Sequence, residues 1–217
     1  MPKIKIPKSA PSLDMTPMVD LAFLLVTFFI LTANFRKEEA VRIDTPSSTS
    51  EKILPENVMM LTIDTGGRVF FDVGGQDVRL ETLTNMADKY GVKLTSTDIK
   101  RYQVGSAIGV PMNRALEYIR ADEKGRTIID KTTPGIPIDS VSGQLDDWVY
   151  FAANARVHFA EKNNIKDNNE LRSVVVKADG KANYKVVRHV MQICQDRNLH
   201  RFNLITNMET DPTKGAK

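Results

Sequence analysis

The amino-acid sequence predicts a single N-terminal transmembrane helix followed by an α+β domain, a small sheet with helices packed on one face. Three observations lead to this fold class. Residues 17–35 are apolar apart from one ionisable residue, Asp20. From Val58 the apolar residues alternate with a period of two, as in a strand. Further along the chain apolar residues recur at helical spacing, and 217 residues give room for one ordinary domain.

The composition excludes several classes of function. The net charge of +3 argues against a dedicated nucleic-acid binder, which would need a basic patch. A lone cysteine, Cys194, allows no internal disulfide and no Cys-rich metal site, and the three histidines lack ligand spacing. The glycine-loop, zinc-hydrolase and serine-hydrolase motifs do not occur. We therefore expect no enzyme activity, no metal and no cofactor.

The apolar segment has the length of a membrane span. Eighteen helical residues extend about 27 Å, close to the hydrocarbon core of about 30 Å. A buried helix this apolar would need a larger protein around it. A cleaved signal peptide is the other alternative, but the run is long, contains an acid and is followed by no A-x-A cleavage site. We therefore favour a permanent anchor over residues 16–36.

The flanking charges predict the orientation of this span. Cations precede it, whereas those behind it are balanced by acids, which places the N-terminus in the cytoplasm. These residues are Lys3, Lys5 and Lys8 before the span, and Arg36, Lys37, Glu38 and Glu39 after it.

The residues around Asp20 are partly explained by the preferences of the first turn of a helix. Pro17 fits the first turn, and Asp14 or Thr16 would lie near the N-cap. The helix macrodipole favours an acid in the first turn of any helix, so that effect alone could account for Asp20.

A polar stripe favours a functional role. At about 100° per residue, Thr27 lies about 20° from Asp20 around the helix, and Thr16 and Asn34 lie about 40° away. Only Thr32 lies well off this stripe. Polar side chains in a span normally face a partner or a water-filled cavity. The stripe therefore indicates either one wall of an ion path or a contact between helices.

The carboxyl group of Asp20 is suited to carrying a proton. A charge at the centre of a span costs about 2.5–3.5 kcal/mol on insertion scales, so desolvation favours the protonated form. The helix N-terminus favours the ionised form. A carboxyl group between these effects could gain and lose a proton near neutral pH.

These residues resemble a known family. The stretch LDMTPMVDLAFLLVTFFILTANF is similar to the N-terminal signature of the ExbD/TolR family, in which a T-P-x-x-D element opens a single span and its acid is essential for proton use. Here that element is Thr16, Pro17 and Asp20. The family often has Asn where this chain has Asp14, and an acid where it has Ser12. Asp14 could be a second acid at the entrance, although an N-cap role fits it better.

The resemblance returns later in the chain. NVMMLTIDTGGRVFFDVGGQDVRLETL resembles the family's first periplasmic hairpin and helix. SVVVKADGKANYKVVRHVMQICQDRNLHRFNLIT resembles its closing strand–helix–strand unit. The likeness thus covers roughly residues 12–90 and 171–207. Residues 92–170 are unlike short family members, and we interpret them as a largely helical insertion packed beside the two halves of the fold.

The resemblance implies a subunit of a proton-driven motor in the inner membrane of a Gram-negative bacterium. Its polytopic partner would be ExbB-like (TolQ/MotA-like), its periplasmic target a TonB-like protein, and the subunit would act as a homodimer within the complex. Asp20 would carry the proton, with Thr16, Thr27 and Asn34 lining the path or facing the partner. The alternatives are a TolR-like subunit of a TolQ–TolR envelope-integrity motor, and a membrane-anchored binding module with no proton role.

The predicted organisation follows from these elements. Residues 1–15 form a cytoplasmic segment, 16–36 the span and 37–56 a flexible linker rich in Ser, Thr and Pro. Residues 57–208 form the periplasmic α+β domain, and 209–217 a disordered tail. Within the domain we expect a hairpin around the DTGG turn, and then a helix with Leu80, Leu83, Ala87 and Tyr90 on one face that stops at Gly91.

Two further helices are expected in the domain. One has an apolar stripe of Leu145, Trp148, Ala152, Ala155 and Phe159, interpreted as core. The other carries Cys194, interpreted as core filler rather than a reactive thiol.

Overall fold

The computed structural model describes residues 15–32, 47–48, 58–139, 143–165, 171, 173–204 and 207–208. The chain divides into two compact units, Met1–Lys37 and Glu38–Lys217. The described part of the first unit is mainly helix α1 (Thr16–Thr32). In the residues that the structure describes, no helix combines the length and the apolar character needed to cross a membrane. The last part of the predicted span, residues 33–36, lies outside the described residues.

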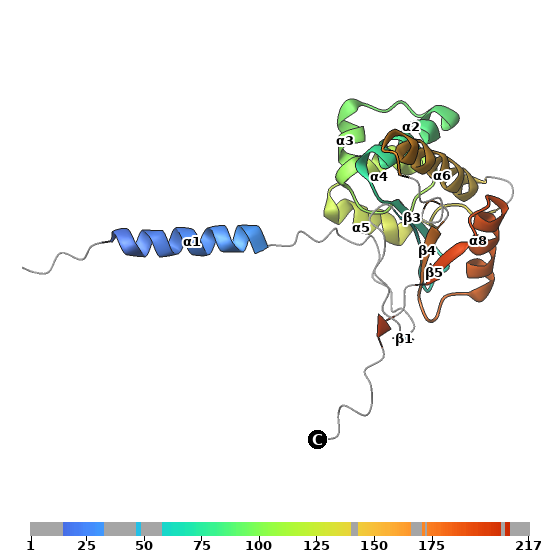
Figure 1. Cartoon of the computed structure of the whole chain (residues 1–217). Helices are drawn as coiled ribbons and strands as arrows, with labels where there is room; N and C mark the ends of the chain where they lie inside the picture. Colours follow the sequence, from blue (N-terminus) through green and yellow to red (C-terminus); the bar gives the residue numbers. More distant parts are fainter. Residues whose placement is uncertain are drawn as a thin grey trace, which may run out of the picture. The chain divides into compact units, whose positions relative to one another are not determined.

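The second unit is built around a mixed four-stranded sheet (Figure 1). Its strands run in the order β3-β2-β4-β5. Strands β2 and β3 are antiparallel, whereas β4 is parallel to both β2 and β5. The bounds are β2 (Met59–Ile63), β3 (Val69–Val73), β4 (Ser173–Ala178) and β5 (Arg201–Leu204). A separate parallel pair joins β1 (Ser47–Ser48) to β6 (Asn207–Met208).

The predicted hairpin is present. Strands β2 and β3 pair from Met59 opposite Val73 to Ile63 opposite Val69. The turn between them is fixed by Asp64, whose carboxylate accepts a hydrogen bond of 2.8 Å from the backbone N–H of Arg68. Burial alternates along β2, so one face of the hairpin is directed into the core, as the period of two predicted.

Helices fill the connections of the sheet. Helix α2 ends at Gly91, as predicted, because this residue adopts a left-handed φ of 67° that favours glycine. The bounds are α2 (Gln76–Tyr90), α3 (Ser96–Val104), a 3₁₀ turn (Met112–Arg114), α4 (Ala115–Arg120), α5 (Glu123–Thr132), α6 (Gln144–Lys162) and α8 (Tyr184–Asp196).

Trp148 of α6 lies at the centre of the core. Its side chain is fully buried, and its ring centre lies 5.3 Å from that of Phe71 in β3 and 6.3 Å from that of Tyr102 in α3. Helices α2 and α8 pack into the same core. Of the predicted apolar face of α2, Leu83 and Ala87 are buried and Tyr90 packs against the core, whereas Leu80 is only half-buried. The buried apolar side chains of α2 are Val78, Leu83, Met86 and Ala87.

Residues 92–170 do not form a body beside the domain, which corrects the sequence interpretation. The stripe of α6 is core, as predicted, but it belongs to the same core as β2 and β4. This stretch is also joined to the edge of the sheet, because Ile108 and Phe71 of β3 exchange two backbone hydrogen bonds of 2.8 Å. The physical reason is that the sheet alone cannot bury its apolar face, and α6 supplies the apolar stripe that covers it.

Candidate functional site

Helix α1 begins close to the predicted position. The backbone N–H of Val19 donates a hydrogen bond of 3.1 Å to the carbonyl of Met15, so Met15 precedes the first helical residue. Thr16 is therefore the first residue of the helix and lies next to the N-cap position at Met15, which agrees with the prediction that it lies near the N-cap. Pro17 lies in the first turn, where its missing N–H costs no helical hydrogen bond. The other N-cap candidate, Asp14, lies outside the described residues.

The surface of helix α1 is apolar apart from its threonines and Asp20. The helix has no buried residue, and its large apolar side chains are between 54% and 85% exposed. A soluble monomer rarely leaves so large an apolar surface in water. In its working state this helix therefore requires apolar surroundings, from lipid or from other helices.

The structure places three of the predicted site residues on one helix. Asp20 lies exposed on α1, on the same side as Thr16 and Thr27 by helical geometry. The hydroxyl of Thr27 donates to the carbonyls of Phe23 and Leu24, at 3.0 and 2.9 Å. The hydroxyl proton of Thr27 is thus hydrogen-bonded within α1, and the lone pairs of its oxygen are the polar groups that Thr27 adds to the stripe. Asn34 lies outside the described residues.

The thiol of Cys194 is structural, as predicted. It is fully buried on α8, and burial raises its pKa to about 12. A thiol with so high a pKa is neither a nucleophile nor a metal ligand at neutral pH. The described residues contain no grouping of His, Cys, Asp and Glu that could hold a metal ion.

Asp130 of α5 is a buried carboxyl with an altered proton affinity. Burial raises its pKa to about 6, against the opposing influence of the Tyr118 hydroxyl, which donates a hydrogen bond of 3.3 Å. The guanidinium groups of Arg68 and Arg126 also act against this rise. Oδ1 of Asp130 finds no donor within the described part of the chain. The group is therefore held partly protonated near pH 6.

Asp130 should make the domain less stable as pH rises from about 4 to about 6. In this window the unfolded carboxyl has lost its proton and the folded one has kept it, so folding binds a proton. A rise in pKa from 3.8 to about 6 corresponds to roughly 3 kcal/mol in the free energy of unfolding. Denaturant titrations across this range should show the loss, and Asp130→Asn should remove that part of it. Parallel pH profiles for the two proteins would contradict the assignment.

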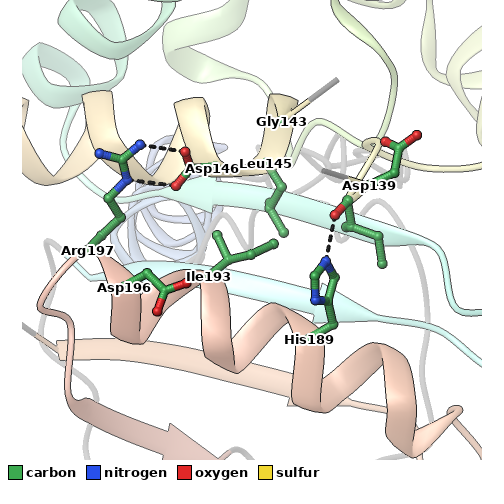
Figure 2. Close-up of a pocket in the computed structure, with 9 residues that line it drawn as sticks. Asp139, Gly143, Leu145, Asp146, His189, Ile193, Asp196 and Arg197 are labelled. Atoms are coloured by element: carbon green, nitrogen blue, oxygen red, sulfur yellow. Dashed lines mark hydrogen bonds and ion pairs between the residues drawn. The ribbon is translucent and has the colours of Figure 1, made fainter. Parts of the chain in front are cut away.

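The second unit also contains a pocket that the sequence did not indicate. It has a volume of about 330 Å³ and lies between the start of α6 and helix α8 (Figure 2). Its lining comes from two stretches that are far apart in the sequence, the start of α6 with the loop before it and the second half of α8 with Arg197, so no local motif marks it. Its residues are Ile138, Asp139, Gly143, Leu145, Asp146, His189, Ile193, Asp196 and Arg197.

Comparison with known families decides the identity of the chain. A family model described as biopolymer transport protein ExbD/TolR matches residues 7–209, which is most of the sequence. The chain belongs to the ExbD/TolR family. Proteins of this family are transport motor subunits and not enzymes. They are anchored in the inner membrane and carry a periplasmic domain, and membership implies a motor partner of the ExbB/TolQ type.

The ExbD/TolR assignment confirms the resemblance inferred from the sequence. The match includes the T-P-x-x-D element, the hairpin and the closing strand–helix–strand unit. Searches of curated proteins and of solved structures gave no match to this chain.

Proposed function

We propose that this ExbD/TolR protein is the proton-motive-force transducing subunit of an ExbB–ExbD type motor, and that Asp20 carries the proton. The observation that carries the proposal is a single carboxyl group on a helix that is otherwise apolar. Such an acid within a membrane helix is a functional residue by default, because leaving it there without a role would only destabilise insertion.

The proposal places α1 in the inner membrane with the N-terminus in the cytoplasm. Its 17 residues extend about 26 Å. Four further helical residues, 33–36, would bring the length to about 32 Å, enough for the hydrocarbon core of about 30 Å. The exposed apolar side chains of α1 would then face lipid and the helices of the polytopic partner.

The polar stripe would determine which side of α1 faces the partner protein. Asp20 and Thr27 would face a helix of the ExbB-like partner, with Thr16 and Asn34 as further polar positions along the same line. In this arrangement Asp20 takes a proton from one compartment and releases it to the other as the helices move. The periplasmic domain would act as a homodimer and contact a TonB-like protein.

Complementation tests this proposal against a TolR-like role. The chain and its cognate partner would be expressed in bacteria lacking either their own ExbB–ExbD pair or their own TolQ–TolR pair. We expect recovery of TonB-dependent uptake in the first strain and no recovery of envelope integrity in the second. The reverse result would assign a TolR-like role.

A matched chimera separates the motor from a simple anchor. Residues 16–36 would be replaced by an unrelated apolar span of equal length, without an acid. The proton-carrier proposal requires that this chimera be inactive although it reaches the membrane in normal amounts. Full activity would establish the membrane-anchored binding module instead.

A further inference from the structure

Helix α5 carries two buried polar atoms that find no hydrogen-bond partner in the described part of the chain. They are Nε of Arg126 and Oδ1 of Asp130. The two residues lie four positions apart on the helix, a spacing that makes side chains neighbours on one helix face. A buried polar group without a partner is destabilising, most of all when it is charged. A donor and an acceptor on neighbouring side chains are thus both unused in the observed arrangement.

The other oxygen of the Asp130 carboxyl group lies against the hydroxyl of Tyr118 in α4. That hydroxyl has one proton and two acceptors within reach, the carbonyl of Ala107 at 3.1 Å and Oδ2 of Asp130 at 3.3 Å. A protonated carboxyl group brings a proton of its own, so Asp130 can donate to the Tyr118 oxygen while Tyr118 donates to Ala107. An ionised carboxylate can only accept, and one of the two acceptors then goes without a donor. The observed arrangement therefore suits the protonated form of Asp130.

Arg68 is the second group that faces Asp130, and it comes from the turn that precedes β3. Its guanidinium group is held by Asp64, with Nε 2.6 Å and Nη2 2.5 Å from Oδ2 of that carboxylate. Nη1 of Arg68 donates to the backbone carbonyl of Asp130. Arg68 thus ties the main chain of α5 to the sheet, and it is already engaged by acceptors other than the Asp130 carboxyl group.

Arg126 is the third group, and it is held loosely. Its Nη2 donates a long hydrogen bond of 3.4 Å to the carbonyl of Ile119, and its guanidinium carbon lies 5.8 Å from the ring centre of Tyr118. The charges of Arg68 and Arg126 both favour the ionised form of Asp130. Of these two cations Arg126 has the unused buried donor, so it is the one that can become the partner of an ionised Asp130.

We propose that Asp130 exchanges the Tyr118 hydroxyl for the Arg126 guanidinium group as its hydrogen-bond partner when it loses its proton. In the protonated state Asp130 ties α5 to α4 through Tyr118. In the ionised state the carboxylate pairs with Nε of Arg126 within α5, and Tyr118 keeps the carbonyl of Ala107. The exchange satisfies both atoms that lack a partner in the observed arrangement and makes the contact between α4 and α5 depend on pH.

The exchange is expected near pH 6, because burial raises the pKa of Asp130 to about 6. It belongs to the second unit of the chain, whereas Asp20 lies in the first. The inference therefore does not depend on the proton role of Asp20, and either proposal can fail without the other.

Nuclear magnetic resonance on the full-length chain in detergent tests the exchange, from about pH 4 to about pH 8. One sample carries ¹³C in the aspartate carboxyl groups and another ¹⁵N in the arginine side chains, with signals assigned from Asp130→Asn and Arg126→Lys. The Asp130 carboxyl group should titrate near pH 6. The Nε–H proton of Arg126 should move downfield with the same midpoint, because it gains a charge-assisted hydrogen bond. In Asp130→Asn the Arg126 signal should not change over this range.

A matched pair of variants separates a direct partner from a nearby charge. Arg126→Gln and Arg68→Gln each remove one cation that acts on Asp130. The proposal predicts that Arg126→Gln raises the Asp130 midpoint by at least about one pH unit and that Arg68→Gln raises it less. Charge alone would give the opposite order, because Arg68 has the larger electrostatic effect on Asp130. Asp122→Asn, the same change at the N-cap of α5, is the control and should leave both midpoints unaltered.

Three results would overturn the proposal. The first is an Arg126 Nε–H signal that stays constant while Asp130 titrates, a result that needs no variant and therefore no assumption about folding. The second is an Arg126 signal that still titrates in Asp130→Asn. The third is a shift from Arg68→Gln that equals or exceeds the shift from Arg126→Gln, in variants whose circular dichroism melts match that of the parent.

Discussion

Asp20→Asn should abolish proton-driven work while the protein still assembles with its partner. The amide has nearly the same shape as the carboxyl group but does not titrate, so a path that needs a proton carrier loses its carrier. The measurement is proton flux into proteoliposomes that contain the chain and its ExbB/TolQ-type partner, followed with an internal pH dye at a clamped membrane potential. We expect the flux to fall to the level of empty liposomes.

Two controls make this result specific. Asp20→Glu keeps the titratable group on a longer stem and should retain part of the flux, whereas Asp88→Asn makes the same chemical change at an exposed position of α2 and should retain all of it. Thr27→Val should have a smaller effect than Asp20→Asn, because the Thr27 hydroxyl already donates its proton to its own helix. Normal flux through the Asp20→Asn complex would show that the proton takes another route.

Trp148→Ala should destabilise the periplasmic domain by about 3–5 kcal/mol. The substitution removes the largest buried side chain of the core and leaves a cavity against Phe71 and Tyr102. Because Trp148 is the only tryptophan, denaturant unfolding must be followed by circular dichroism rather than by intrinsic fluorescence. The mutant should show a lower transition midpoint with a similar slope.

Trp148→Phe distinguishes the effect of a cavity from the effect of losing the indole N–H. The indole Nε1 has no acceptor among the described residues, so phenylalanine removes an unpaired N–H while it keeps an aromatic ring. We expect this variant to lose much less stability than Trp148→Ala. A loss of under 1 kcal/mol for Trp148→Ala itself would mean that residues 92–170 are not part of the cooperative core.

The sequence predicted the elements whose signal is local. The period of two gave the β2–β3 hairpin, Gly91 gave the end of α2, and the stripe around Trp148 gave α6. Asp20 remains a predicted site residue that was selected on the same kind of signal, because one acid in an apolar run can be recognised without tertiary information. These predictions depend only on the spacing of residues along one segment, and that spacing can be read from the sequence without knowledge of the fold.

The features of the fold that could not be predicted depend on contacts between residues far apart in the sequence. The pairing of Phe71 with Ile108 follows from no periodicity, and it brings residues 92–170 into the domain. On α2, Leu80 is less buried than expected because apolar residues on two sides compete, and packing on α6 decides between them. The pocket is lined by two stretches of sequence, one around Leu145 and one around Ile193, and no local pattern reveals that they meet.

The place of β2 in the sheet has a mechanical consequence. Among the strands of the four-stranded sheet β2 comes first in the chain, and it has a hydrogen-bonded neighbour on each side, β3 and β4. Tension applied along the axis of β2 would therefore load both rows of hydrogen bonds lengthwise, in shear, so that many must fail together. A strand at the edge of a sheet that is pulled perpendicular to its axis would instead separate from its neighbour one hydrogen bond at a time. The chain thus enters the sheet through the strand best placed to bear a load.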